Sequence, residues 1–138
     1  MDTSTERLDK SRLEQLSLFR WQLRRFLRFS EDAAREAGIT AQQYQLLLHT
    51  QGFPGREWAS IGELAERLQT QHHSAVALTT RCEEAGLVQR RPNRSDARLV
   101  EIHLTRAGRR CLEQVARMHA SEIPALAEVV ARTRKAGG

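Results

Sequence analysis

Hydrophobic residues recur at helical spacing along a long N-terminal segment, from about Leu8 to Ala37. They lie mostly three or four positions apart, the spacing that places side chains on one face of a helix. The stripe consists of Leu13, Leu16, Phe19, Leu23, Phe26 and Leu27, widened by Trp21 and Phe29. Gly38 follows it as a typical C-terminal glycine. The stripe is wide for one side of a small domain, so we expect this helix also to pack against a second chain.

A second helix is predicted over residues 41–50, with Thr40 as its N-cap. Its inward-facing residues are expected to be Tyr44, Leu47 and Leu48. Gly-Phe-Pro-Gly at residues 52–55 then breaks the chain. The loop that follows carries Trp58, which we interpret as a plug over the core.

Two shorter helices come next, separated by a tight turn. Ser60 and Glu63 have the spacing of a capping box, and the helix that they open ends near Gln69. Residues 70–71 supply the turn, and another helix follows over about residues 73–85. One face of that helix carries Ala75, Leu78, Thr79 and Cys82, and the opposite face carries His73, Val76, Ala77, Thr80, Arg81 and Glu84. The small side chains on the second face leave room for a close approach to a partner.

The stretch from Gly86 to Thr105 predicts a β-hairpin. The apolar pair at 87–88 opens one strand, the polar residues at 92–96 are typical of a turn, and the alternating run at 99–104 forms the returning strand. A helix-turn-helix followed by such a hairpin is a winged helix. The predicted fold class is therefore mainly α with a small β-hairpin wing. In a helix-turn-helix the second helix enters the major groove, so the partner implied is double-stranded DNA.

Thr105 caps a further helical pattern that runs toward the C-terminus. Pro124 interrupts this pattern. A last short helix before a basic tail is indicated by Ile123, Leu126, Val129 and Val130.

The basic residues are concentrated rather than spread. The net charge is +5, from 22 Lys and Arg against 17 Asp and Glu. Arginine crowds residues 90–110, at Arg90, Arg91, Arg94, Arg98, Arg106, Arg109 and Arg110. A guanidinium donates paired N–H groups to phosphate oxygens, so this density favours a nucleic-acid backbone as partner. The alternative is a solvated basic face without a partner.

A length of 138 residues is typical of one domain. No apolar run approaches the ~18–20 residues that a membrane-spanning helix needs, and the N-terminus does not have the pattern of a signal peptide. We therefore expect a cytoplasmic protein without a membrane partner. Cys82 and Cys111 fall on apolar helix faces, which favours buried thiols over a disulfide.

The sequence contains no arrangement typical of catalysis: it has no glycine-rich phosphate loop, no G-x-S-x-G and no H-E-x-x-H. We therefore expect no enzyme activity and no cofactor. His72 and His73 are adjacent, so on a helix they diverge by about 100°, and no further ligand follows at metal-binding spacing. We expect no metal there. These histidines are candidates for hydrogen bonds to phosphate or to a guanine edge, and an unengaged surface pair is the alternative.

Three motifs resemble the MarR family of bacterial transcription regulators. They are GELAERL at residues 62–68, EEAGLV at 83–88, and the wing motif formed by Arg90, Pro92, Asn93, Asp96, Arg98, Leu104, Thr105 and Gly108. The resemblance covers essentially the whole chain. Cys82 departs from the leucine usual in the family, and Ala77 departs from the arginine or other polar base-reading residue often found there. Position 77 therefore inherits no role from the family.

The resemblance implies one MarR-like domain over residues 1–138. Residues 41–105 would form the winged helix-turn-helix, and residues 8–37 and 106–135 would form dimerisation helices. It further implies a homodimer on a roughly palindromic operator. The family reading is a repressor of a nearby operon, released by a small, often aromatic, effector. Residues that could line an effector cleft are Trp21, Arg25, Tyr44, Leu48 and Trp58.

Expected DNA contacts lie on the second helix of the helix-turn-helix and on the wing. Base contacts are expected from His73, Ser74, Val76, Ala77 and Thr80, and backbone contacts from Arg81, Arg94 and Arg98. His72, Asn93, Ser95 and Asp96 complete the predicted DNA-binding set. Asp96 and Arg98, two residues apart on an extended strand, could also pair with each other.

Three other functions stay open at this point. One is a winged-helix module that binds protein, although an arginine-rich wing argues against it. Another is a nonspecific DNA-binding protein, which would lack a preferred sequence. The third is a regulator that senses oxidation through Cys82, although a buried thiol disfavours the reactive thiolate.

Overall fold

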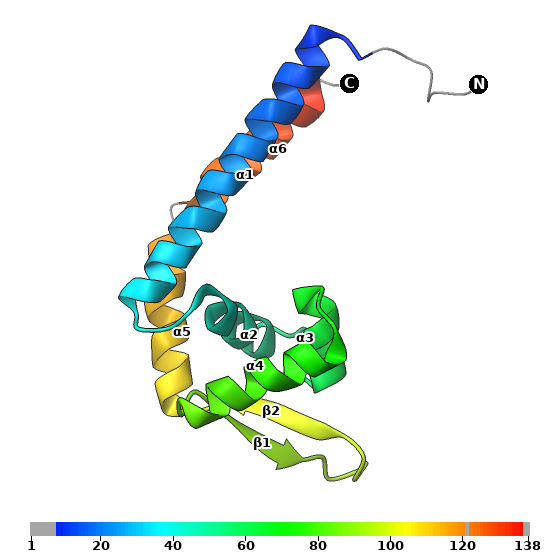
Figure 1. The fold of residues 1–138 in the computed structure, drawn as a ribbon, viewed down its shortest axis with the longest axis vertical. Coiled ribbons are helices and arrows are strands. Elements are labelled where there is room, and N and C mark those ends of the chain that lie inside the picture. Colours follow the sequence, from blue (N-terminus) through cyan, green and yellow to red (C-terminus); the bar gives the residue numbers. More distant parts are fainter. Residues whose placement is uncertain (1–7, 121, 137–138) are drawn as a thin grey trace, which may run out of the picture. The chain divides into compact units, whose positions relative to one another are not determined.

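The computed structural model describes residues 8–120 and 122–136 and has six helices and one β-hairpin in this part of the chain (Figure 1). The elements are α1 (Lys10–Glu36), α2 (Ala41–Gln51), α3 (Ile61–Leu68), α4 (His72–Glu84), β1 (Val88–Pro92), β2 (Val100–Leu104), α5 (Arg106–His119) and α6 (Glu122–Ala136). This confirms the predicted fold class. The chain divides into two compact units, residues 31–118 and residues 1–30 together with 119–138.

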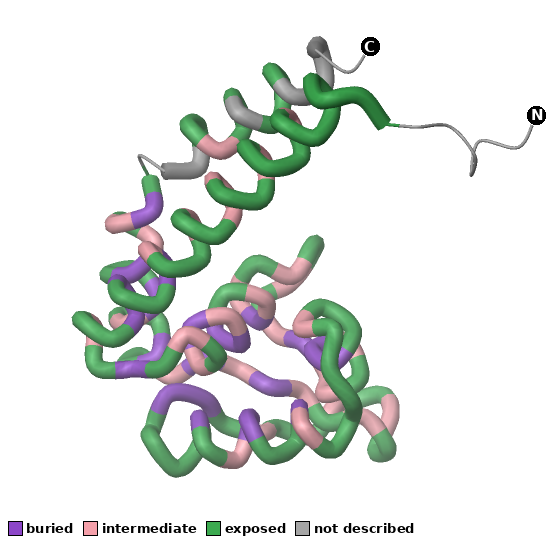
Figure 2. Tube along the Cα trace, turned by 45° about the horizontal axis from the view of Figure 1, so that its top comes forward, coloured by how far each residue is buried: buried purple, intermediate pink, exposed green. Residues whose placement is uncertain are grey.

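Residues 31–118 form the winged helix, built on a single apolar core. The largest fully buried side chains of this core include Leu46, Leu47, Leu64, Val88, Ile102 and Val115. They come from α2, α3, the hairpin and α5, and Figure 2 shows buried positions on each of these elements. Burial of branched apolar side chains from separate elements is the main favourable term that fixes a small domain.

Local capping chemistry sets the ends of the helices. Thr40 and Ser60 each accept a backbone N–H at the third helical position, and Gln43 and Glu63 reach back to the cap, so α2 and α3 both begin with a capping box. Gln69 adopts the left-handed conformation with φ 53°, which ends α3 and lets the chain turn sharply into α4. The two helices are thereby held as a helix-turn-helix.

The hairpin is anchored at its base and along its outer edge. β1 and β2 are antiparallel, with Val88 opposite Leu104 and Pro92 opposite Val100. The free edge of β2 is met by Ala59, whose N–H donates to the Ile102 carbonyl at 3.3 Å and whose carbonyl accepts from Ile102 at 2.8 Å. A third short backbone segment therefore protects this edge of the wing.

The base of the wing also contacts the start of α5. The Thr105 hydroxyl donates to the Gly86 carbonyl at 2.6 Å and accepts the Gly108 N–H at 3.0 Å. Gly108 lies so close to Leu87 that a Cβ added there would stand 2.0 Å from the Leu87 carbonyl oxygen. Only glycine fits between α5 and the first residue of the wing.

Two sequence predictions are corrected. Leu48 is 39% exposed, and Leu46, at 0% exposure, takes the inward position instead. The last helix is not short, because α6 spans 15 residues and contains Pro124 within its first turn. A proline is tolerated there since the first N–H groups of a helix have no partner within the helix. The side chains of Ile123 and Val129 lie outside the described residues.

In the smaller unit, α6 lies beside α1 (Figure 1). Both helices line a shared hollow through Gln22, Arg25, Phe26, Phe29, Ala125, Leu126 and Glu128. His119 is buried at 2% exposure with its ring 5.3 Å from that of Phe29. Along α1, large apolar side chains stay 41–56% exposed at Leu13, Leu16, Leu18, Trp21 and Leu27. No helix in the described part of the chain is long and apolar enough to cross a membrane.

Candidate nucleic-acid interface

The two faces of α4 differ as the sequence predicts. Ala75, Leu78, Thr79 and Cys82 are buried against the core. On the opposite side His72, His73, Val76, Ala77 and Arg81 are exposed, and Ser74 and Thr80 are half-buried. The N-cap of α4 is Gln71, which makes no side-chain capping hydrogen bond. The N-terminus of this helix therefore has no capping side chain in the place where an external acceptor such as phosphate would bind.

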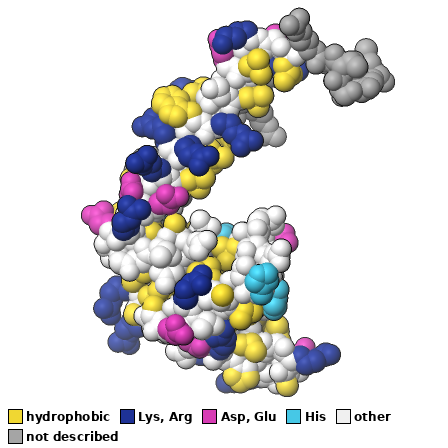
Figure 3. Space-filling view, viewed as in Figure 1, with side chains coloured by type: hydrophobic (Ala, Val, Ile, Leu, Met, Phe, Trp, Pro, Cys, Tyr) yellow, Lys and Arg dark blue, Asp and Glu magenta, His cyan; other side chains and the backbone are white. Residues whose placement is uncertain are grey.

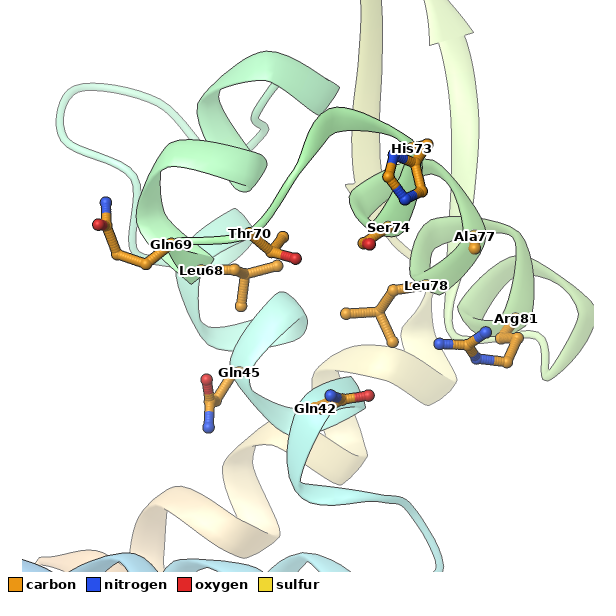
Figure 4. A pocket seen from close by; sticks show the side chains of 10 residues that line it. All are labelled: Gln42, Gln45, Leu68, Gln69, Thr70, His73, Ser74, Ala77, Leu78 and Arg81. Atoms are coloured by element: carbon orange, nitrogen blue, oxygen red, sulfur yellow. The ribbon is translucent and has the colours of Figure 1, made fainter.

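A hollow of about 440 Å³ lies beside this helix, between α2, the α3–α4 turn and α4 (Figure 4). Leu68 and Leu78 form its apolar part. Its polar lining includes Gln42 and Gln45 of α2, and Arg81 of α4 stands at its edge. No sequence pattern indicates this hollow, because its walls come from three elements and periodicity describes each element separately.

The tip of the wing is organised by Asn93. Its side-chain oxygen accepts the N–H groups of Ser95 and Asp96, both at 2.9 Å, and its amide donates to Glu101 at 2.7 Å. This is an Asx-type turn, in which the side chain replaces a missing backbone partner. The turn leaves the following arginine-bearing tip in solvent.

The predicted pair between Asp96 and Arg98 is present, with 3.3 Å between Arg98 Nε and Asp96 Oδ1. The two residues lie in the loop before β2 and not on an extended strand, which corrects the sequence prediction. The Arg98 side chain is 94% exposed, so this pair contributes little to stability. Arg94 is exposed as well, and Figure 3 shows basic side chains at the hairpin tip on the same face as exposed histidines.

A contact that the sequence analysis missed joins the wing to α4. Arg90 of β1 donates to Glu83 at 2.6 Å and to the Thr80 hydroxyl at 3.1 Å. The Arg90 backbone N–H also lies 3.3 Å from the second Glu83 carboxylate oxygen. Arg90 therefore fixes the position of the wing relative to the exposed face of α4. No sequence pattern marks this pairing, because it depends on the hairpin folding back along the helix.

Behind the wing, a stack of charged and aromatic groups ties the 53–58 loop to the hairpin. The Arg56 guanidinium lies 3.8 Å from the centre of the Trp58 ring and pairs with Glu63. The other partner of Trp58 is His103, whose ring is stacked at 6.4 Å. His103 in turn contacts Glu101 at 2.8 Å. Trp58 is half-buried in this stack, in agreement with its interpretation as a plug.

Two carboxylates of this stack have lowered pKa values. For Glu101 the hydrogen bond with His103 is the main cause, opposed by partial desolvation and assisted by Asn93. For Glu63, desolvation on its own would raise the pKa, and the hydrogen bonds from Ser60 and Arg56 outweigh it. Both groups are therefore held in their charged form at neutral pH.

The proposed effector residues are divided between the two units. Trp21 is 56% exposed, with the Arg25 guanidinium 5.4 Å from the centre of its ring. Tyr44 is buried, and this burial raises the pKa of its hydroxyl. Leu48 is exposed, and Trp58 is half-buried. Each of these residues is placed only within its own unit, so their role in one cleft stays a prediction.

The two cysteines are free thiols in different surroundings. Cys82 is fully buried on the inner face of α4, and burial raises its pKa to about 11, although the charge of Arg81 opposes the shift. Cys111 is half-buried. The Cys82 thiol is therefore protonated at neutral pH, which does not favour rapid oxidation.

Comparison with solved structures identifies proteins of the same fold. AbsC, a MarR family transcriptional regulator from Streptomyces coelicolor, is 22% identical over 94% of this chain and 82% of its own, with a TM-score of 0.69. A mutant of MarR from E. coli in complex with operator DNA is 22% identical over 86% of this chain and 87% of its own, with a TM-score of 0.69. A mutant of MepR from S. aureus bound to an oligodeoxyribonucleotide is 20% identical over 81% of this chain and 80% of its own, with a TM-score of 0.65. No curated protein matches the sequence.

These structural likenesses establish the fold. A family model also matches a segment that contains the helix-turn-helix and the first part of the wing, as far as residue 99. That model is the one of the MarR family, and it matches residues 37–99. The expectation that the protein is a regulator and not an enzyme agrees with this family match. Residues 37–99, which contain the helix-turn-helix, are therefore similar to the MarR family.

Proposed function

We propose that this protein is a sequence-specific, double-stranded DNA-binding transcriptional regulator. The observation that carries the proposal is the exposed face of α4, which Arg90 holds next to an arginine-bearing wing tip. A helix that presents small and polar side chains fits the major groove, and arginines at a neighbouring tip fit the phosphate backbone or the adjacent minor groove. The protein would act where the DNA is, in the cytoplasm.

The contacts divide by chemistry. Base contacts are assigned to His73, Ser74, Val76, Ala77 and Thr80 on α4. Backbone contacts are assigned to Arg81, Arg94 and Arg98, and His72, Asn93, Ser95 and Asp96 complete the proposed DNA-binding set. Asn93 and Asp96 also shape the loop that presents the arginines, since their side chains hold the N–H groups of the tip.

We further propose a homodimer on a roughly palindromic operator. The 41–56% exposure of the large apolar side chains along α1 supports a partner for this helix, because such a stripe is unfavourable in water. Two winged helices related by a two-fold axis would read half-sites about one helical turn apart. Light scattering at several protein concentrations measures the dimer directly, and a monomer at micromolar concentration contradicts it.

The finer proposal is a repressor whose DNA affinity falls when a small aromatic molecule binds. The exposed Trp21 with its neighbouring Arg25 supports an aromatic or anionic ligand in part, because the pair offers a ring face and a cation. An effector must bind the two DNA-affinity states differently to act. Operator affinity that stays unchanged at saturating concentrations of aromatic acids would argue against this release.

Fluorescence anisotropy tests the central proposal. The purified protein is titrated with DNA from upstream of its own coding region and with shuffled DNA of the same composition, at matched salt. A preference of ~10³ or more establishes a specific regulator. Equal and steeply salt-dependent binding indicates a nonspecific DNA-binding protein, and no binding at low salt indicates a protein-binding winged helix.

A further inference from the structure

The exposed stripe of α4 changes chemistry along its length. With about 100° per residue, His73, Ala77, Thr80 and Glu84 point away from the buried face, and Val76 lies at the side of this row. The first turn is polar and carries the two histidines. The middle turn is apolar, with Val76 at 36% exposure and Ala77 exposed. An exposed valine followed by an alanine is the part of the stripe that no hydrogen bond can explain.

The side chains that usually read bases by hydrogen bonds are missing from this middle turn. The helix, described over its whole length, has the sequence HHSAVALTTRCEE and contains no Asn, Gln or Lys. Its single arginine, Arg81, stands at the edge of the hollow beside α2. The hydroxyl of Thr80, the next residue of the row, accepts a hydrogen bond from Arg90. The centre of the helix therefore presents methyl groups to a base edge.

We propose that Val76 and Ala77 read thymine through its C5-methyl group, which makes T·A pairs in the middle of each half-site the positions that determine specificity. The C5-methyl is the only apolar group that a base presents in the major groove, and small apolar side chains are its natural contacts. This inference rests on the proposed DNA-binding function. It adds the chemical class of base that the site recognises.

The surroundings favour DNA over an apolar protein partner at this patch. On the outer face of α4 the exposed apolar side chains are Val76 and Ala77, in a helix that also exposes two histidines, and the wing carries Arg91, Arg94 and Arg98. A protein-binding patch is usually larger and continuous. Small apolar side chains with basic groups beside them are complementary to a major groove that has phosphates along its edges and thymine methyl groups on its floor.

The first experiment selects bound sequences from a random duplex pool with the full-length protein. Each thymine of the enriched site is then replaced, one at a time, by deoxyuridine, which removes the methyl and keeps every hydrogen-bonding group. At one or two central positions of each half-site we expect about fourfold weaker binding, the size typical of one buried methyl. A duplex with 5-methylcytosine·G in place of the same T·A pair should be bound more tightly than a duplex with cytosine·G there.

A pair of matched variants links the effect to the side chain. Val76→Thr keeps the branched shape and exchanges one methyl for a hydroxyl. For this variant, the affinity ratio between the thymine duplex and the deoxyuridine duplex, which is the deoxyuridine penalty, should fall from about four toward one at the position that Val76 contacts. Val100→Thr makes the same exchange at a valine of the wing strand that is 39% exposed, and there the penalty should stay at about fourfold.

The outcomes separate this inference from the function on which it rests. An enriched site whose affinity is insensitive to deoxyuridine at every position overturns thymine reading and leaves sequence-specific DNA binding intact. The same holds if both valine variants keep the full penalty. A pool that yields no enriched sequence refutes the proposed function and, with it, this inference.

Discussion

A pair of glycine substitutions tests how closely the wing is fitted to α5. Gly108 and Gly62 both lie near the start of a helix, in α5 and α3. An added Cβ at Gly108 would stand 2.0 Å from the carbonyl oxygen and 3.0 Å from the carbonyl carbon of Leu87. At Gly62 nothing lies within 4 Å. The same change to alanine should therefore have opposite effects at the two positions.

The magnitude follows from two opposing terms. Alanine gains up to about 1 kcal/mol over glycine in a helix. At Gly108 the neighbour is backbone, which cannot turn away as a side chain would, so we expect a steric penalty of about 3 kcal/mol, at the upper end for overpacking. The net loss for Gly108→Ala is then about 2 kcal/mol, or about 7 °C in Tm for a chain of this length. Gly62→Ala should gain about 2–3 °C.

Thermal unfolding followed by circular dichroism measures both changes, at one protomer concentration, because dimerisation would make Tm depend on it. The Leu87 carbonyl also accepts the Thr105 N–H at 3.0 Å, and Leu87 directly precedes β1. A displacement of the Leu87 backbone should therefore move the wing. Operator affinity of Gly108→Ala should fall at temperatures where the protein is still folded. A Gly108→Ala variant as stable as the Gly62→Ala variant would refute the reasoning.

Three further predictions concern the interface and its surroundings. Arg94→Ala should weaken binding to all DNA sequences and lower the slope of log affinity against log salt by roughly 1, whereas His73→Ala should change the preference among sequences; equal losses on operator and random DNA for both would contradict this. Glu101, with its pKa below the ordinary 4.5, stabilises the fold above that pH and loses this contribution as the pH falls, so urea titrations of Glu101→Gln should show a flatter decline in acid. A thiol reagent at neutral pH should label half-buried Cys111 well before Cys82, whose pKa is about 11, and peptide mass spectrometry distinguishes the two.

The parts of the fold that were predicted are those set by local chemistry. Ser60 with Glu63, and Thr40, carry their capping partners within three residues, so the helix starts could be found without knowledge of the fold. The two faces of α4 follow from a period of 3.6 residues. The hairpin follows from an alternating run that returns after a polar turn.

The missed features depend on contacts between elements. Residues 46–48 are all leucine, so periodicity alone does not decide which of them turns outward, and the packing of α2 places Leu48 there. Arg90 reaches Glu83 and Thr80 only because the hairpin folds back along α4. The hollow beside α4 has walls from α2, the turn and α4 itself. Sequence patterns describe each element separately and therefore did not reveal these arrangements.

The geometry of the winged unit also assigns affinity and discrimination to different elements. Arg94 and Arg98 are exposed on a loop that Asn93 and Asp96 hold open, so contacts from this loop would go to phosphates and depend strongly on salt. The middle turn of α4 carries no charge, so contacts from it would discriminate between bases with little dependence on salt. Arg90 joins the two elements through its hydrogen bonds to Thr80 and Glu83. The ratio of specific to nonspecific affinity should therefore change less with salt than either affinity does, since both share the same phosphate contacts.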